Sequence, residues 1–323
     1  MRIRPPRIVF LDAQTVDLGD LDMSPIARQG RYQAYRLTPQ DLVVRRARRA
    51  EIVITNKCLL RKEELAQLKD LKLICVAATG INNVDLEEAK KRGIRVKNVA
   101  GYSTTTVAEH TLMFLLALSH RLMEHHRAAS ERWVGSPFFA ILDHPFADLA
   151  GKTLGIVGYG AIGKMVARLA RALGMKILIA KIPGRRYPLS RISPSLPHRL
   201  PLNQLLRMSD FVTLHCPLTK ETDRLINRST LNGMKKGSTL LNLARGKVVD
   251  EVAVETALKT GRLAGYATDV LSEEPPRRNH PLLQKSLRDK VLLTPHIAWA
   301  SCESRQRLVD AIGLNITHFK AET

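Results

Sequence analysis

Acidic residues are scarce in this chain, and one long stretch has none at all. Over 323 residues there are 51 lysines and arginines against 30 aspartates and glutamates, a formal net charge of +21. From Leu149 through Ser209 there is no Asp or Glu. An excess of cations attracts phosphorylated cofactors, carboxylate substrates or nucleic acid. A generally basic, solvated surface is the alternative explanation.

Cysteines and long apolar runs are also few. The longest apolar run, Leu112 to Leu118, is far shorter than the roughly 20 residues of a membrane span. The basic N-terminus lacks the apolar core of a signal peptide. No CxxC pair occurs, which argues against a disulfide framework or a zinc site. We expect reduced thiols in a cytoplasmic protein with no membrane partner and no metal; the cysteines are Cys58, Cys75, Cys216 and Cys302.

Short β-branched runs alternate with helical patterns, which is typical of parallel α/β architecture. Residues 7–11, 51–55, 72–78 and 94–98 form a first series of predicted strands. A second series covers residues 153–157, 176–180, 211–215, 239–243, 264–268 and 291–295. We predict an α/β protein of two doubly wound parallel-sheet domains with a cleft between them. A flavodoxin-like substrate domain covers 1–100 plus 298–323, and a Rossmann cofactor domain covers 101–297.

Four helices have recognisable signals. Residues 38–50 are expected to begin with Thr38 as the cap, and residues 85–93 to end at the left-handed Gly93. Residues 104–130 predict one long helix, too apolar near its start for a surface helix and therefore buried between domains or subunits. A last helix over 304–319 is expected to fold back on the first domain. The histidines of the long helix are interpreted as packing and surface residues: His110, His120, His125 and His126.

A G-x-G-x-x-G motif occurs at Gly158, Gly160 and Gly163, between a predicted strand and an amphipathic helix. In this context the first glycine permits a tight turn, the second lets backbone approach a pyrophosphate, and the third allows close helix–strand contact. The helix N-terminus offers N–H groups to the phosphates. The motif therefore predicts a dinucleotide site, with a glycine turn that binds nothing as the alternative.

The acid that usually holds the adenosine ribose is missing. The second strand of this unit ends at Lys181, and the acid-free stretch around it carries eleven basic residues. Cations there would pair with the 2′-phosphate of NADP, whereas a carboxylate would repel it. We therefore predict a preference for NADP, with Lys181, Arg185 and Arg186 as phosphate ligands. Alternatively, these side chains point into solvent and either cofactor is accepted.

Reactive residue types follow three later strands. Arg245 and His296 each come directly after a strand, and Asp269, Glu273 and Glu274 lie in the stretch YATDVLSEEPP. An arginine can bind a carboxylate bidentately, and a histidine held by a carboxylate can deliver a proton. Reduction of a 2-keto acid needs this set. A buried ion network without catalysis is the alternative.

The chain resembles the D-isomer-specific 2-hydroxyacid dehydrogenase family over nearly its whole length. The matching stretches are GYGAIG, HCPLTKET, MKKGSTLLNLARGKVVDE, ATDVLSEEPP and LLTPHIAWAS. LICVAATGINNVD, GYSTTTVAEH and SPFFAILDHP resemble its glycerate dehydrogenase (hydroxypyruvate reductase) branch, which often has an acidic residue where this chain has Lys181.

The resemblance implies catalytic roles for three residues. Arg245 would bind the substrate carboxylate, His296 would be the general acid–base, and Glu274 would orient and charge His296. The backbone at Ala78, Thr79 and Gly80 would receive the substrate carboxylate from the other domain. Trp299, Phe138 and Phe139 are expected to shape a small pocket. The implied cofactor contacts are Thr104, Gly158, Gly160, Ala161, Ile162, Gly163, Lys181, Arg185, Arg186, Cys216, Pro217, Thr222, Leu243, Ala244, Arg245, Asp269, His296 and Ala298.

The resemblance implies an NAD(P)-dependent oxidoreductase that reduces hydroxypyruvate to D-glycerate, with glyoxylate as a second substrate, and that forms a homodimer. The alternative is a dinucleotide-sensing, corepressor-like scaffold of the same fold. The run RRARR at Arg45 to Arg49 could suit nucleic acid. A solvated helix face is the simpler account of that run, so a nucleic-acid partner is not expected.

Overall fold

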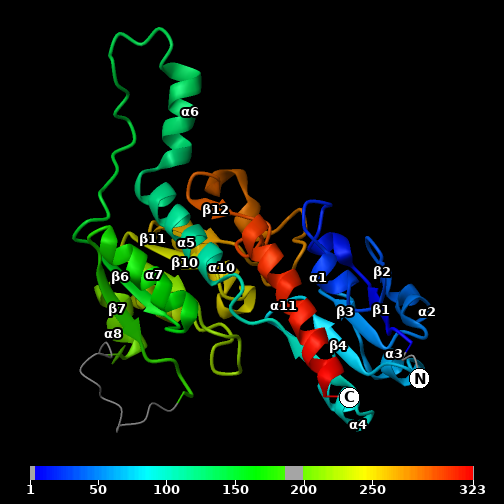
Figure 1. Ribbon diagram of the computed structural model, residues 1–323. Coiled ribbons are helices and arrows are strands. Elements are labelled where there is room, and N and C mark those ends of the chain that lie inside the picture. The colour runs from blue at the N-terminus through cyan, green and yellow to red at the C-terminus, as the bar shows by residue number, and fades with distance from the viewer. Residues whose placement is uncertain (1–3, 186–198, 323) are drawn as a thin grey trace. The chain divides into compact units, whose positions relative to one another are not determined.

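The computed structural model of the protein describes residues 4–185 and 199–322. The chain divides into two compact units: unit 1 is Met1–Ser103 with Trp299–Thr323, and unit 2 is Thr104–Ala298. Each unit is built on one sheet whose paired strands are all parallel. The predicted fold class, two doubly wound α/β domains, is confirmed (Figure 1).

Unit 1 has a five-stranded sheet in the order β2-β1-β3-β4-β5, the order of flavodoxin-like folds. Its strands are β1 Arg7–Phe10, β2 Arg31–Ala34, β3 Ile52–Thr55, β4 Leu73–Val76 and β5 Arg95–Asn98. Its α-helices are α1 Ser24–Ala27, α2 Val43–Ala47, α3 Lys62–Gln67, α4 Leu86–Lys91 and α11 Cys302–Ala321.

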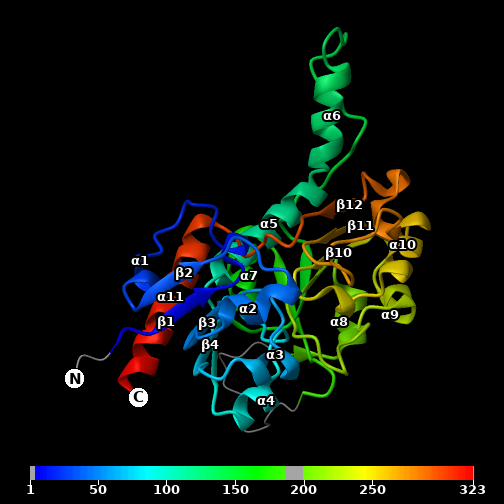
Figure 2. The same ribbon diagram turned by 90° about the vertical axis from the view of Figure 1, so that its right-hand side faces the viewer.

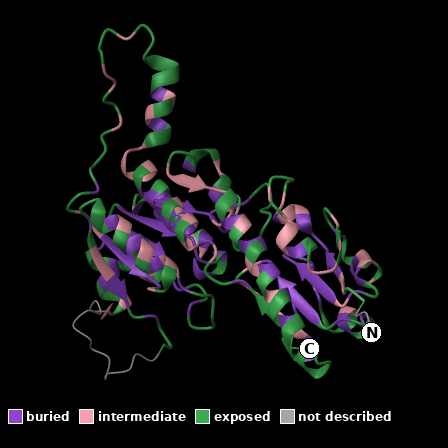
Figure 3. Ribbon diagram, in the orientation of Figure 1, coloured by how far each residue is buried: buried purple, intermediate pink, exposed green. Residues whose placement is uncertain are grey.

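The two faces of this sheet bury alternate side chains of the same strands, as the pleat requires. Phe10, Ile54 and Cys75 belong to one cluster, which α11 completes with residues such as Leu308 and Ile312. Val9, Val53 and Ile74 belong to the opposite cluster, with Val43 of α2, Leu65 of α3 and Ala89 of α4. The central strands β1, β3 and β4 are consequently buried along most of their length (Figure 3).

Unit 2 has a seven-stranded sheet in the order β12-β11-β10-β9-β6-β7-β8. The order reverses between β6 and β9, as in a Rossmann fold, and this switch point is where such sheets bind ligands. The strands are β6 Thr153–Val157, β7 Lys176–Ala180, β8 Arg199–Leu200, β9 Phe211–Leu214, β10 Ser238–Asn242, β11 Leu263–Thr268 and β12 Val291–Leu293.

Helices cover both faces of the unit 2 sheet. The helices are α5 Thr104–Ser119, α6 Leu122–Arg132, α7 Ala161–Ala172, α8 Leu202–Met208, α9 Arg228–Gly233 and α10 Glu251–Lys259. Leu205 of α8, Leu231 of α9 and Leu258 of α10 share one apolar cluster with the strands. α5 packs against α7, β10 and β11 in front of the sheet in Figure 1, with α10 behind it.

The prediction of one helix over 104–130 is wrong. Arg121 takes a left-handed conformation with φ +50°, so α5 ends at Ser119 and α6 starts at Leu122. Such a break is usually made by glycine, and an arginine gives no sign of it in the sequence. Figures 1 and 2 both show α6 and the segment after it projecting from the rest of unit 2.

One further local prediction is wrong, and two short strands were not predicted. Thr38 does not cap a helix; its hydroxyl instead donates to the carbonyl of Leu11, and α2 covers only Val43–Ala47. β2 was not predicted because it is a largely exposed edge strand without an apolar run. β8 was not predicted because it has only two residues. By contrast, α4 is followed by Gly93 at φ +69°, which confirms the predicted left-handed end of this helix. Asp85 caps its start.

Among the described residues, no helix combines the length and apolar character that crossing a membrane would require.

Candidate active site

The glycine motif occupies the switch point of the unit 2 sheet. Gly158 directly follows β6 and has φ +105°, a conformation that glycine adopts without steric cost. A Cβ at this position would lie 2.4 Å from the carbonyl carbon of His215, just beyond β9. Glycine is therefore required here both by the turn and by the close approach of two backbones.

The other two glycines differ in their surroundings, as expected for a turn that binds phosphate. A Cβ at Gly163 would lie 2.1 Å from the Gly158 carbonyl oxygen, so Gly163 brings α7 close to the turn. A Cβ at Gly160 would meet no atom of the described residues within 4 Å. Gly160 thus leaves open space beside the N-terminus of α7, where backbone N–H groups attract phosphate. The motif fits a bound dinucleotide.

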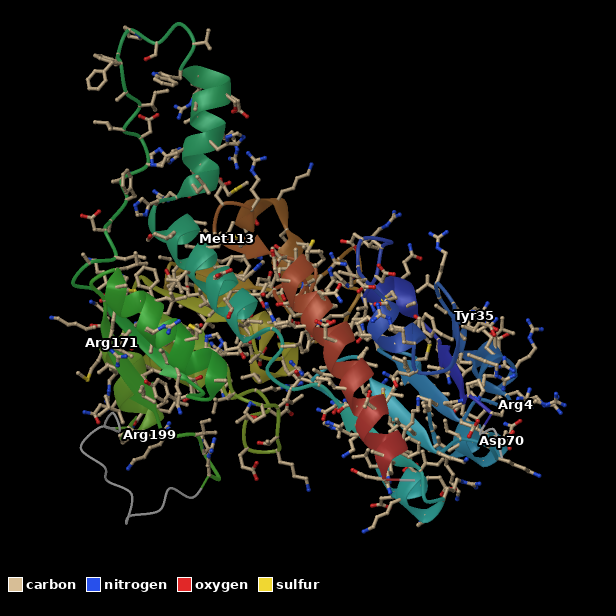
Figure 4. The ribbon with its side chains drawn as sticks, in the orientation of Figure 1. Arg4, Tyr35, Asp70, Met113, Arg171 and Arg199 are labelled. Atoms are coloured by element: carbon tan, nitrogen blue, oxygen red, sulfur yellow. The ribbon has the colours of Figure 1, made fainter. Side chains whose placement is uncertain are left out.

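Lys181 is the residue predicted to lie beside the adenosine ribose. It is exposed directly after β7, and its N–H donates to Leu200 of β8 at 2.8 Å. Arg199, labelled in Figure 4, starts β8, and its guanidinium carbon lies 5.7 Å from the ring centre of Tyr159 within the glycine turn. Arg185 is exposed. Arg186 lies outside the described residues.

An acid from another segment lies beside this region, which the sequence interpretation missed. A Cβ at Gly184 would lie 2.6 Å from Cγ of Glu221, so the Glu221 side chain packs on the segment after β7. The Thr219 hydroxyl donates to Glu221 at 2.8 Å and lowers the pKa of that carboxyl group. The sequence interpretation considered only residues close to Lys181 in the chain, and it therefore did not identify this acid.

Glu274 and His296 form a hydrogen-bonded pair, although 22 positions separate them. Nδ1 of His296 donates to Oε2 of Glu274 at 2.6 Å, and the Leu271 N–H donates to Oε1 at 2.9 Å. The side chain of His296 remains 32% exposed and that of Glu274 remains 36% exposed. This geometry fixes the imidazole through Nδ1, so any proton exchange with a ligand would take place at Nε2.

The backbone of His296 is strained, with φ +56°. Such a conformation in a residue other than glycine persists only when its surroundings impose it. Asp269, just after β11, imposes it here: its carboxylate accepts from the N–H groups of Ile297 at 2.9 Å and Ala298 at 2.8 Å, and from the Thr294 hydroxyl at 2.5 Å. Asp269 is 3% exposed, so it anchors the segment that carries the histidine.

His110 of α5 also contacts this segment, a role that the sequence interpretation did not assign. Because the Thr294 hydroxyl donates to Asp269, the 3.0 Å contact between Thr294 and His110 is a hydrogen bond donated by Nε2 of His110. Burial lowers the pKa of His110, and the nearby Asp269 charge opposes this effect. His110 is therefore neutral, and its hydrogen bond to Thr294 helps to hold the segment that carries His296.

Arg245 follows β10 at the same edge of the sheet. The residue is exposed, and one guanidinium nitrogen donates to the Ala244 carbonyl at 2.7 Å. A Cβ at Gly246 would lie 1.9 Å from the carbonyl carbon of Leu271, whose N–H binds Glu274. The Arg245 segment thus touches the Glu274 loop through backbone. Glu273, in contrast, pairs with Arg277 at the surface.

Several residues implied as cofactor contacts have structural roles within unit 2. The Thr222 hydroxyl donates to the Pro217 carbonyl and is fully buried, so it shapes the loop after β9. Thr104 starts α5, and Ala161 and Ile162 start α7. The remaining implied contacts are buried at strand ends or beside His296: Cys216, Leu243, Ala244 and Ala298.

The remaining predicted substrate residues lie in unit 1. Ala78, Thr79 and Gly80 follow β4 at the carboxyl edge of its sheet. Asn98 donates to the Thr79 carbonyl at 2.7 Å, and the Thr79 hydroxyl donates to Val99 at 3.1 Å.

The aromatic residues predicted to shape a pocket fall in both units. Trp299 packs edge-on against Tyr102 in unit 1. Phe138 and Phe139 of unit 2 lie after α6 and are exposed.

Comparison with known proteins agrees with this geometry. Residues 112–298 match the model of the D-isomer specific 2-hydroxyacid dehydrogenase NAD binding domain. Glycerate dehydrogenase of Methylorubrum extorquens is 38% identical over 98% of this chain and 96% of its own. Hydroxypyruvate reductase of Blautia hydrogenotrophica is 35% identical over 97% and 96%. The structure of D-lactate dehydrogenase from Aquifex aeolicus, complexed with NAD and lactic acid, has a TM-score of 0.81 at 28% identity, covering 98% and 96%.

A Rossmann unit with a carboxylate–histidine pair at its carboxyl edge is the arrangement of a nicotinamide-dependent oxidoreductase. The chain belongs to the D-isomer specific 2-hydroxyacid dehydrogenase family.

Proposed function

We propose that this protein reduces hydroxypyruvate to D-glycerate, with glyoxylate as a second substrate, using a reduced nicotinamide cofactor. The observation that carries the proposal is the 2.6 Å pair of His296 and Glu274 at the end of the sheet. Relatives named glycerate dehydrogenase, hydroxypyruvate reductase and glyoxylate reductase support this substrate class.

The residues of this site divide the work of 2-keto acid reduction. The exposed Arg245 guanidinium binds the substrate carboxylate and draws electron density from the keto oxygen. His296 holds a proton on Nε2 and gives it to that oxygen as the alcohol forms. Glu274 accepts from Nδ1 and stabilises the charged imidazole before transfer. In the reverse direction His296 removes the same proton.

The cofactor fits the glycine turn, where Gly160 leaves space and α7 presents its N-terminus. When bound, the nicotinamide supplies the hydride for the keto carbon. The residues after β10 and β12, including Leu243, Ala244 and Ala298, border that position as proposed cofactor contacts. Asp269 contributes by holding the Thr294–Ala298 segment in place.

A cofactor-oxidation assay tests the proposed activity. Hydroxypyruvate, glyoxylate, pyruvate and phenylpyruvate are compared with both reduced nicotinamides, and the highest kcat/KM is expected with hydroxypyruvate. Absence of turnover on all four, together with salt-dependent retention on DNA, would favour the scaffold alternative. The names of the relatives do not favour that alternative.

We further propose that the site prefers NADP. Lys181 directly follows β7, and Arg199 on the adjacent β8 lies beside Tyr159 of the glycine turn. These two cations are the proposed partners of a 2′-phosphate. Arg185 adds a third cation. Glu221 opposes this preference because its carboxylate packs against Gly184, next to Arg185.

The Lys181→Ala variant is expected to lower kcat/KM with NADPH about tenfold, the value of one charge-assisted hydrogen bond, and to leave kcat/KM with NADH nearly unchanged. Lys176→Ala, at the opposite end of the same strand, is the matched control and should alter neither. Steady-state rates with both cofactors measure the ratio. Equal losses with both cofactors, or a wild-type preference for NADH, would rule out this proposal.

We also propose that the protein is a homodimer. The segment from α6 onward exposes Leu122, Met123, Trp133, Val134, Phe138, Phe139, Leu142 and Phe146. Monomers rarely leave so large an apolar surface in water. Since this segment projects from unit 2 (Figure 2), a second copy of the chain is the occupant proposed here.

Light scattering should therefore give the mass of two chains, and the double substitution Phe138→Asp and Phe139→Asp should reduce it to one. Charged groups in an apolar interface are costly because they lose water. Leu314→Asp, on an exposed position of α11, is the control and should stay dimeric. A wild-type protein of single-chain mass would contradict the proposal.

We place the protein in the cytoplasm. Its four cysteines are free thiols, which suits a reducing compartment. Recovery in a secreted or membrane fraction would overturn this assignment.

A further inference from the structure

Unit 2 buries an ionic group that the proposed mechanism does not use. Glu251, the first residue of α10, is 8% exposed. Its Oε1 accepts from the Ser272 N–H at 2.8 Å, and its Oε2 accepts from the Ser272 hydroxyl and from Nε2 of His280 at 3.2 Å. Both oxygens of this buried carboxylate are therefore used to hold residues outside its own helix.

His280 completes the cluster as a neutral imidazole. It is also 8% exposed, and its Nδ1 accepts from the Leu282 N–H at 3.3 Å. An Nδ1 that accepts carries no proton, so the ring hydrogen is on Nε2 and points at Glu251. Glu251 is thus bonded to both ends of the Ser272–His280 segment, which includes Glu274.

The peptide bond between Leu271 and Ser272 connects this cluster to the catalytic residues. Its Ser272 N–H binds Glu251, while the preceding Leu271 N–H binds Oε1 of Glu274 at 2.9 Å. The same peptide packs on Gly246, next to Arg245, where a Cβ would lie 2.3 Å from the Ser272 nitrogen. A shift of this peptide would therefore move Glu274 and displace Gly246 as well.

We infer that Glu251 is a positioning residue for catalysis, acting through the Leu271–Ser272 peptide on Glu274 and thereby on His296. The inference rests on the catalytic roles proposed above for Glu274 and His296. Without the Glu251 carboxylate, the Ser272 and His280 donors lose a buried acceptor, which the loop can restore only by moving. A small misplacement of a catalytic group costs rate more than it costs binding.

The test compares Glu251→Gln with Glu255→Gln. Glu255 lies one turn later on α10 and binds Lys259 and Gln284, not the catalytic loop, so its variant is expected to keep wild-type kcat. Glu251→Gln retains size and one acceptor oxygen but faces the His280 donor with an amide. We expect kcat to fall about 10- to 100-fold, with KM for the keto acid and Kd for the reduced nicotinamide unchanged.

A double-mutant cycle with Glu274→Gln separates positioning from general weakening of the fold. If Glu251 acts through Glu274, the loss of kcat from Glu251→Gln largely disappears when Glu274 is already replaced. An equal fold-loss in both backgrounds, or wild-type kcat in Glu251→Gln, would overturn the inference alone. Full turnover in Glu274→Gln itself would refute the proposed catalytic pair, and this inference with it.

Should Glu251→Gln fail to fold, Ser272→Ala replaces it in the same cycle. This variant removes only the hydroxyl that donates to Glu251 and keeps the Ser272 N–H. A smaller loss of kcat that depends on Glu274 supports positioning by Glu251. Unchanged kcat, or a loss that is independent of Glu274, rejects it.

Discussion

Alanine in place of His296 is expected to lower kcat about 1000-fold, within the range that one general acid–base group contributes. The proton that completes the alcohol would then have to come from water. Kd for the reduced nicotinamide should change little, because the glycine turn at Gly158–Gly163 is untouched. Initial rates of cofactor oxidation and a fluorescence titration measure the two quantities separately.

The matched control for this substitution is His318→Ala, on an exposed position of α11, which should retain full activity. Turnover undiminished in His296→Ala would refute the catalytic assignment. Joint loss of turnover and of cofactor binding would instead indicate that the strained segment after β12 had collapsed.

Lysine in place of Arg245 is expected to lower kcat/KM about 100-fold, close to 3 kcal/mol of transition-state stabilisation. Lysine keeps the charge but is a single donor centre, whereas the guanidinium presents parallel N–H groups that match a carboxylate. Most of the loss should appear as a higher KM for the keto acid. Steady-state kinetics with hydroxypyruvate provide the measurement.

Two comparisons make the Arg245 result specific. Arg228→Lys, on an exposed position of α9, should behave as wild type. Wild-type enzyme should prefer pyruvate strongly over pyruvamide, which lacks the carboxylate, and Arg245→Lys should reduce that preference. An unaltered preference would show that another group recognises the acid.

Most of the fold could be predicted from local sequence because its central strands are buried on both faces. Runs such as those of β3, β6 and β10 are rich in β-branched and aliphatic residues and are buried along almost their whole length. The exposed edge strand β2 carries no such signal. The break between α5 and α6 was unpredictable for a different reason: Arg121 adopts a backbone conformation that its residue type disfavours.

The clustering of the candidate site residues could be predicted where they lie at strand ends. Arg245, Asp269 and His296 each follow a strand of one parallel sheet, so they share its carboxyl edge. Contacts that cross between distant loops carry no local pattern. His110 beneath Thr294 and Glu221 against Gly184 are therefore visible only in three dimensions.

Unit 1 takes its last helix from beyond unit 2, and this has a consequence for biosynthesis. The apolar face that β1, β3 and β4 present is covered by Leu308, Ile312 and Ile316 of α11. All of unit 2 is translated between those strands and that helix. During synthesis the strands of unit 1 therefore lack α11 on one face until the last residues are translated. The sequence of the Rossmann unit is complete before that point, so this unit can fold first.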